Sequence, residues 1–179
     1  SRKLKSKTIL IGAQNSTHHK ESGPYTGSVN PTMLKAVGAK FVILGHYENR
    51  CEGETNELIK KKLIESHRKN LKVILCIGES LNQKKQKKTY QVIKNQLRKI
   101  LDKKTKPENI ILAYEPIWCI GTNNLPKEIE LRKIITFIKK ESKKILKSKK
   151  LPKVLYGGSV NPRNIHLFSK ITQLDGLLV

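Results

Sequence analysis

Six short apolar runs recur along the chain at similar spacing. They are residues 8–13, 41–45, 73–77, 110–114, 154–156 and 176–179. Each run is too short for a helix and is apolar throughout, without polar alternation. That pattern is typical of strands buried on both faces of a parallel sheet. The chain is therefore predicted to contain six such strands.

Helical patterns lie between these runs. Apolar residues return every three or four positions in the stretches 54–70, 89–101, 126–146 and, more briefly, 162–168. We expect Ile64 in the first stretch and Ile129 in the third to belong to the buried stripes. Strands that alternate with helices indicate repeated βαβ units. No linker or change of composition divides the chain, so we expect residues 1–179 to form a single domain.

The residues that follow the predicted strands help to choose between an open sheet and a barrel. Five strands are followed by polar or glycine-rich residues: Gln14-Asn15, His46-Tyr47-Glu48, Gly78-Glu79, Glu115 and Gly157-Gly158-Ser159. An open sheet concentrates its site at one switch point, whereas a barrel brings all its strand ends to one mouth. We therefore predict an α/β fold, a (β/α)8 barrel, incomplete here because only about six of its eight units are present.

Composition limits the cellular setting. No stretch of eighteen apolar residues is present, and the first five residues lead into no apolar run, so neither a membrane span nor a secretory signal is expected. The three cysteines, Cys51, Cys76 and Cys119, form no C-x-x-C pair. A reducing, cytoplasmic location fits this usage. Cys76 lies inside an apolar run and is expected to be a core residue.

The net charge of +23 would suggest a nucleic-acid or membrane-surface partner. Of the 37 basic residues, however, only six are arginine, the residue that readers of bases and phosphates favour. The lysines lie in stretches such as 84–88 and 139–144, which we interpret as helical and which carry few aromatic residues for base stacking. We expect solvated helix faces and no nucleic acid, with nucleic-acid binding as an alternative.

Two residues have settings suited to proton transfer. Glu115 ends an apolar strand and precedes Pro116, so its carboxylate is expected to be poorly solvated, with the raised pKa of a useful base. His46 also ends a strand and precedes a helix start, where the helix dipole favours a neutral imidazole that can donate a hydrogen bond. The alternatives are an ion-paired or capping glutamate and a hydrogen-bonded loop histidine. No spacing of histidines suggests a metal.

Two further segments suit ligand binding. Residues 118–124 lie between Pro116 and Pro126, and their apolar start followed by Gly and Asn is typical of a lid that excludes water. Gly157-Gly158-Ser159 offers backbone N–H groups and a hydroxyl to an anion. A surface loop and an ordinary glycine-rich turn are the alternatives.

Taken in order, these motifs resemble the triosephosphate isomerase family. Residues 113–118 and 120–122 resemble the segment around that family's catalytic base, and residues 41–46 resemble the strand that carries its electrophile. Further matches are Gln14-Asn15 and residues 22–27, 76–79 and 156–160. The resemblance covers essentially the whole chain and implies a barrel fold.

The resemblance also implies roles for individual residues. Glu115 would move a proton between two adjacent carbons of a triose phosphate, His46 would polarise the carbonyl oxygens, and Glu48 would be a supporting carboxylate. Gly121 and Ser159 would hold the substrate phosphate. The reaction belongs to glycolysis and gluconeogenesis, and no cofactor or metal is expected.

The resemblance further implies a homodimer in which the loop around Thr26 reaches into the partner subunit. The family's first two βα units and its last segment would lie outside residues 1–179. Tyr47 stands where the family usually has Ser, and Asn123 and Asn124 replace its usual Gly-Lys. An inactive, truncated remnant of the enzyme is the second alternative.

Overall fold

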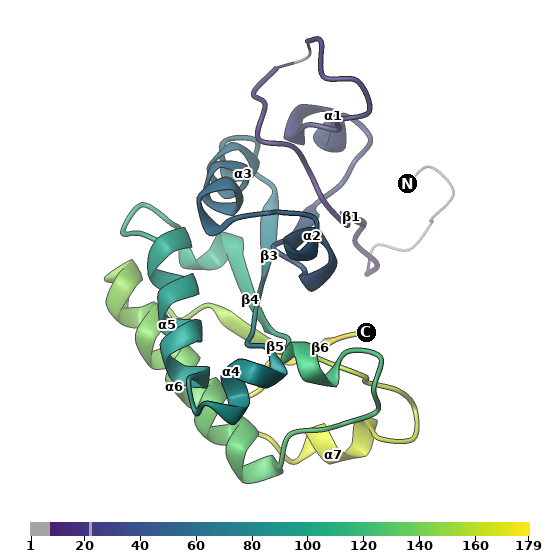
Figure 1. Ribbon diagram of the computed structural model, residues 1–179. Coiled ribbons are helices and arrows are strands. Elements are labelled where there is room, and N and C mark those ends of the chain that lie inside the picture. The colour runs from purple at the N-terminus through teal and green to yellow at the C-terminus, as the bar shows by residue number, and fades with distance from the viewer. Residues whose placement is uncertain (1–7, 22) are drawn as a thin grey trace.

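Six parallel strands form one sheet in this computed structural model, which describes residues 8–21 and 23–179. Each strand is hydrogen-bonded only to its neighbours in sequence, in the order β1 to β6. The strands are β1 (Gly12–Ala13), β2 (Phe41–Leu44), β3 (Lys72–Ile77), β4 (Ile110–Tyr114), β5 (Lys153–Gly157) and β6 (Gly176–Leu178). This unreversed order, with the sheet curled beside its helices (Figure 1), is that of an incomplete (β/α)8 barrel. The expectations for the first five residues and for Ser22 lie outside the described residues.

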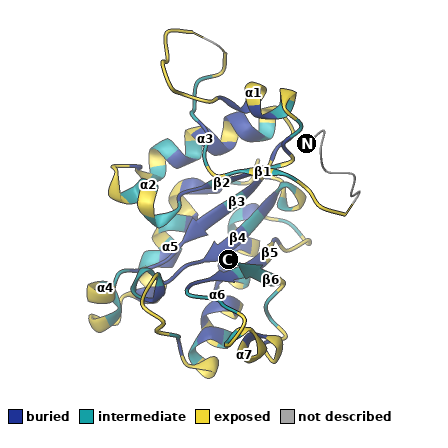
Figure 2. Ribbon diagram, turned by 90° about the vertical axis from the view of Figure 1, so that its right-hand side faces the viewer, coloured by how far each residue is buried: buried dark blue, intermediate teal, exposed yellow. Residues whose placement is uncertain are grey.

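The helices follow the strands in alternation. They are α1 (Pro31–Ala36), α2 (Tyr47–Cys51), α3 (Asn56–Arg68), α4 (Leu81–Lys85), α5 (Thr89–Ile100), α6 (Glu128–Leu146) and α7 (Ile165–Ser169), with 3₁₀ turns η1 (Pro107–Asn109) and η2 (Ile117–Cys119). Helix α3 packs on β2 and β3, α5 on β3 and α6 on β5, and α5 lies between α3 and α6. The long helices thus form one outer layer against the sheet (Figure 2).

The strand register separates a covered face of the sheet from a concave face. Val42, Val73 and Ile110 are in register and fully buried, as are Leu44, Leu75 and Leu112 two positions further along. Between these two layers Ile43, Ile74 and Ile111 are also in register, but they are only partly buried. Because side chains alternate between the faces of a strand, the fully buried layers face the helices and the isoleucine layer lies on the concave face.

The predicted strands agree with the observed ones except at the first. The apolar run 8–13 contributes only Gly12 and Ala13 to the sheet, and Ile9 and Leu10 are more than half exposed. Strand β1 lies at the edge of the sheet and pairs on one side only, with β2. The predicted strand is therefore longer than the observed one, because only two residues of the apolar run pair with β2, its single neighbouring strand.

The helix predictions hold for the four longer stretches and fail for some details. Ile64 on α3 and Ile129 on α6 are exposed, 39% and 70% respectively, and on α3 the charged residues Lys62 and Glu65 are buried. The stretch 84–88 is not one helix, because α4 ends at Lys85 and Lys87 has the left-handed φ of 57°. The short helices α1 and α2 were not predicted, and only the end of α4 was, because five or six residues rarely show a clear helical period.

Burial of the cysteines agrees with the prediction for Cys76. Cys76 and Cys119 are buried and Cys51 is exposed, and none of the three forms a disulfide. In the described part of the chain, no helix combines the length and apolar character needed to cross a membrane.

Candidate active site

The carboxyl ends of the strands surround a cavity of about 480 Å³. Its walls include residues that follow four different strands: Gln14, Asn15, His46, Glu48, Glu115 and Gly157 to Val160. The structure therefore brings together side chains that the sequence separates by more than a hundred residues. Glu79 and Gly121 are not among the lining residues.

Glu115 reaches this cavity from the concave face of the sheet. It follows β4 with the same alternation as Ile111, so its side chain lies on the side where the isoleucine layer is partly open. The residue is 6% exposed, and its Oε2 atom has no hydrogen-bond partner among the described residues. Burial raises the pKa of the Glu115 carboxyl, and the neighbouring Cys76, His46 and Arg50 side chains act in the opposite direction. Such a carboxylate is a stronger base than an exposed one.

His46 lies beside Glu115. It follows β2, and β3 lies between β2 and the strand β4 that Glu115 follows. It is the residue immediately before α2, and its Nε2 atom is 3.7 Å from Oε1 of Glu115. On the other side of the ring, Nδ1 is 3.7 Å from Oε2 of Glu48, a side chain that is largely exposed. The imidazole is therefore directed into the cavity between one buried carboxylate and one solvated carboxylate.

Two glycines make room for Glu115. A Cβ atom on Gly78, just after β3, would lie 1.9 Å from the Glu115 carbonyl oxygen. A Cβ atom on Gly157, at the end of β5, would lie 2.9 Å from Glu115 Cγ. Gly78 thus leaves room for the backbone of Glu115, and Gly157 leaves room for its side chain.

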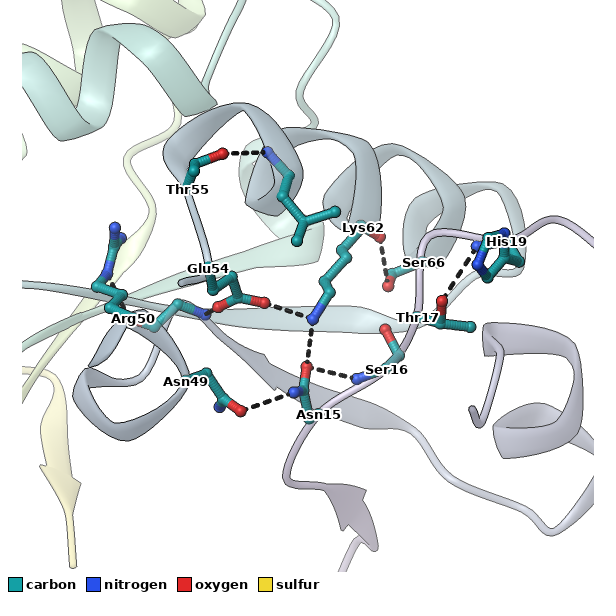
Figure 3. Close-up of polar contacts among 12 residues, drawn as sticks. Asn15, Ser16, Thr17, His19, Asn49, Arg50, Glu54, Thr55, Lys62 and Ser66 are labelled. Atoms are coloured by element: carbon teal, nitrogen blue, oxygen red, sulfur yellow. Dashed lines mark hydrogen bonds and ion pairs between the residues drawn. The ribbon is translucent and has the colours of Figure 1, made fainter. Parts of the chain in front are cut away.

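A chain of polar contacts supports the loop that carries His46 (Figure 3). Oε2 of Glu54 accepts a hydrogen bond of 3.0 Å from the Gly45 N–H, and its Oε1 accepts one from Lys62 Nζ. Lys62 also donates to Oδ1 of Asn15 at 2.9 Å, and the Asn15 amide donates to Asn49 Oδ1 at 2.8 Å. Lys62 and Glu54 are both buried, so each charge is compensated by the other. The network holds the ends of β1 and β2 against α3.

Arg50 ties the same loop to β3. Its Nε donates to the Gly45 carbonyl at 2.7 Å, Nη1 donates to Asn56 Oδ1 at 2.8 Å, and Nη2 donates to the Cys76 carbonyl at 3.2 Å. Because these three hydrogen bonds come from one planar guanidinium, they fix its orientation. The cation therefore joins the residue before His46 to the strand residue that neighbours Glu115.

The segment that we expected to be a lid is anchored on the glycine-rich turn. Ser159 Oγ accepts a hydrogen bond of 3.3 Å from the Asn123 N–H and donates one to the Cys119 carbonyl. Gly121 and Asn123 have the left-handed φ values of 68° and 59°. Asparagine tolerates this conformation better than most residues, so Asn123 fits this backbone.

The indole of Trp118 fixes the start of this segment. Its Nε1–H donates to Glu79 Oε1 at 2.9 Å, and the Tyr114 hydroxyl donates to the same carboxylate at 3.1 Å from Oε2.

Thr26, expected at a subunit contact, lies in the exposed loop between β1 and α1 that extends beyond the sheet (Figure 1).

Comparison with known proteins decides the family. A family model described as triosephosphate isomerase matches residues 1–179. The chain belongs to the triosephosphate isomerase family. The triosephosphate isomerase of Thermoanaerobacter pseudethanolicus is 38% identical over 176 residues, which cover 96% of this chain and 71% of the relative.

Two other relatives named triosephosphate isomerase cover a similar region. The protein of Caldanaerobacter subterraneus subsp. tengcongensis is 37% identical over 184 residues, covering 100% of this chain and 74% of the relative. The protein of Borrelia garinii subsp. bavariensis is 40% identical over 182 residues, covering 98% and 72% respectively. The resemblance proposed from the motifs is confirmed at the level of the family.

Three supporting residues of this chain were missed from the sequence: Glu54, Lys62 and Arg50. A signal for Lys62 was present, because it lies three positions after Ile59 and just before Leu63 on the buried side of α3. A charged residue on the apolar side of a helix requires a buried partner. No pattern in the sequence indicated that the partner would be Glu54 or that Arg50 would bond to backbone carbonyls.

Proposed function

We propose that the complete protein containing this chain catalyses the interconversion of dihydroxyacetone phosphate and D-glyceraldehyde 3-phosphate through an enediol or enediolate. One observation carries the proposal. The Glu115 carboxylate and the His46 imidazole end two different strands, and yet Oε1 and Nε2 are 3.7 Å apart in one cavity of the size of a small metabolite. A base and a hydrogen-bond donor at this spacing can act on adjacent atoms of one substrate.

Glu115 removes the proton from one carbon and returns it to the neighbouring carbon, while the hydroxyl proton passes from one substrate oxygen to the other at the enediol stage. Its burial and the free Oε2 position described above keep the carboxylate poorly solvated, which raises its basicity toward a carbon acid. No oxidation state of the enzyme changes, since one proton leaves and one proton is returned. The chemistry requires neither a metal nor a cofactor.

His46 donates a hydrogen bond from Nε2 to the carbonyl oxygen as negative charge develops there. A donor placed in advance on a developing oxyanion lowers the barrier because it needs no reorganisation during the reaction. Glu48 lies on the Nδ1 side of the ring and supports its orientation. Gly121 and Ser159 bind the substrate phosphate, with the glycine-rich turn forming part of the cavity wall.

The proposal extends to assembly and location. Residues 1–179 form part of one barrel domain, the exposed loop around Thr26 contacts the partner subunit of a homodimer, and the enzyme works in the cytoplasm. The exposed position of Thr26 and the family membership support these statements.

The test follows hydrogen exchange at the substrate carbon. The complete protein that contains this chain should convert triose phosphate in D₂O and incorporate solvent deuterium, read by NMR, whereas Glu115→Gln should do neither at a comparable rate. Glu108→Gln is the matched control, because Glu108 is exposed at the opposite end of β4. A folded wild-type protein that neither turns over nor exchanges the carbon-bound hydrogen would refute the proposal.

A further inference from the structure

One lysine contacts both the start of the lid, defined here as residues 117–127 between β4 and α6, and the first turn of the helix that follows the lid. Lys84, on α4, places its Nζ atom 3.6 Å from the centre of the Trp118 ring. The same Nζ atom donates hydrogen bonds to Glu130 at 3.0 Å and 3.2 Å. Trp118 lies in η2 at the start of the lid, and Glu130 lies in the first turn of α6, where the lid ends.

The ammonium completes the surroundings of the indole. The Nε1–H edge of Trp118 is bonded to Glu79, and the face of the ring carries the Lys84 cation. A cation over an aromatic face is attracted by the ring's quadrupole, most strongly for tryptophan. The edge and the face of one side chain are thus held by groups of opposite charge from the segment that follows β3.

We propose that Lys84 is a positioning residue that clasps the start of the lid to the helix that follows it and sets the arrangement from which the substrate phosphate is bound. This inference rests on the proposed function. Each contact alone is weak, because Lys84 and Glu130 are partly exposed, 27% and 38%. Together they act through one side chain, so the conformational entropy of the lysine is lost once for two contacts.

The contacts of Lys84 with Trp118 and Glu130, here called the clasp, complement the bonds of Ser159 to the lid. Ser159 Oγ holds the Cys119 carbonyl and the Asn123 N–H on the cavity side. Lys84 holds Trp118 and Glu130 from α4, a helix that does not line the cavity. When the clasp is removed, the start of the lid and the helix that follows it lose a shared anchor, and the substrate must order the lid as it binds. The cost falls on substrate binding more than on the chemical step.

The experiment uses the complete protein and four variants. Lys84→Met removes both contacts, Glu130→Gln weakens only the ion pair, and Lys84→Arg restores a cation that can make both. Lys85→Met is the matched control, since the neighbouring Lys85 is exposed and its loss changes the net charge equally. Trp118 is the only tryptophan of these 179 residues, so its fluorescence reports on the clasp once any tryptophan outside them is replaced by phenylalanine.

Two readouts decide the outcome. Lys84→Met should raise the acrylamide quenching constant of Trp118 about twofold and KM for triose phosphate about fivefold, with kcat changed less than about twofold. Glu130→Gln should lie between Lys84→Met and wild type, and Lys84→Arg and Lys85→Met should match wild type. Unchanged quenching and unchanged KM in Lys84→Met would overturn the inference, whether or not the Tm of that variant is lower. Quenching does not depend on turnover, so an inactive wild type would refute the proposed function while the clasp is still tested.

Discussion

The reactivity of Glu115 follows from its place at the end of β4. Strand alternation directs the side chain to the concave face, Gly157 leaves space for it, and burial raises its pKa. An ordinary glutamate would become a weak, well-solvated base in an exposed loop. The position in the strand therefore supplies both the direction and the basicity of the carboxylate.

Shortening this side chain should affect the chemical step. Glu115→Asp in the complete protein retracts the carboxylate by about 1 Å, and a displacement of that size can cost about 10²-fold in rate. We expect steady-state kinetics to show a large loss of kcat with a much smaller rise in KM. An unchanged kcat would remove Glu115 from the role of base.

Replacing His46 should slow enolisation without disturbing the fold. His46→Gln keeps a donor of different reach, and loss of a well-placed donor to an oxyanion costs about 3 kcal/mol, or about 10²-fold in kcat. Circular dichroism should be unchanged, because His46 makes no side-chain cap to α2. Full activity in His46→Ala would mean that another group supplies the hydrogen bond.

The pH dependence should report the environment of Glu115. The base acts as a carboxylate, so kcat/KM should fall as the pH drops through its pKa, which burial places above the usual value. Arg50 lowers that pKa, so Arg50→Gln should move the acid limb of the profile to higher pH. Arg50→Lys keeps the charge and should leave the limb closer to its original position. A shift to lower pH in Arg50→Gln would contradict this assignment.

The approach of β3 to β4 at Gly78 should be intolerant of any side chain. A methyl group at this position would lie 1.9 Å from the Glu115 carbonyl oxygen, so the two strand ends would have to separate. We expect Gly78→Ala to lower the free energy of unfolding by about 3 kcal/mol, as overpacking does when backbone must move. The control is Gly12→Ala, where the new methyl would lie 3.2 Å from Phe41 Cβ at the sheet edge. Chemical denaturation that finds the two variants equally stable would contradict the expectation.

Strands and long helices were predictable because burial leaves a simple signature. A run such as Val73 to Ile77 is apolar on both faces, and the stripe that includes Ile93 and Leu97 has a helical period. Ile129 shows the limit of that signature. It fits the period of α6 but lies in its first turn and is 70% exposed. A periodic pattern indicates which face of a helix is apolar. It does not indicate how far along the helix that face is covered by other parts of the protein.

Of the candidate site, only the functional residues that directly follow a strand were predictable from the sequence. His46 and Glu115 were singled out because each ends an apolar run, and the parallel sheet then brings them together. Lys62, Arg50 and Lys84 come from helices, and their partners are set by how each helix packs on its neighbours. Such long-range pairings depend on three-dimensional geometry that no local sequence pattern specifies.

Both edges of the described sheet are open in the same way. Strands β1 and β6 each have one neighbour, so each presents unpaired backbone groups on its other side. Residues 1–179 expressed alone should therefore self-associate through these edges and show less than about a tenth of the activity of a version extended to the length of the relatives. Light scattering and a coupled assay test this expectation. A monomeric fragment with activity within tenfold of the extended protein would contradict it.

The unreversed order of the strands also has a consequence for how the chain acquires its structure. Each of the strands β2 to β6 pairs with the one synthesised just before it, so a partner is already present when that strand leaves the ribosome. Pairing with the neighbouring unit closes a shorter stretch of chain than pairing with a distant unit would, and the entropic cost of closure grows with that length. Folding can therefore advance in step with translation, each finished strand providing the template on which the next one registers.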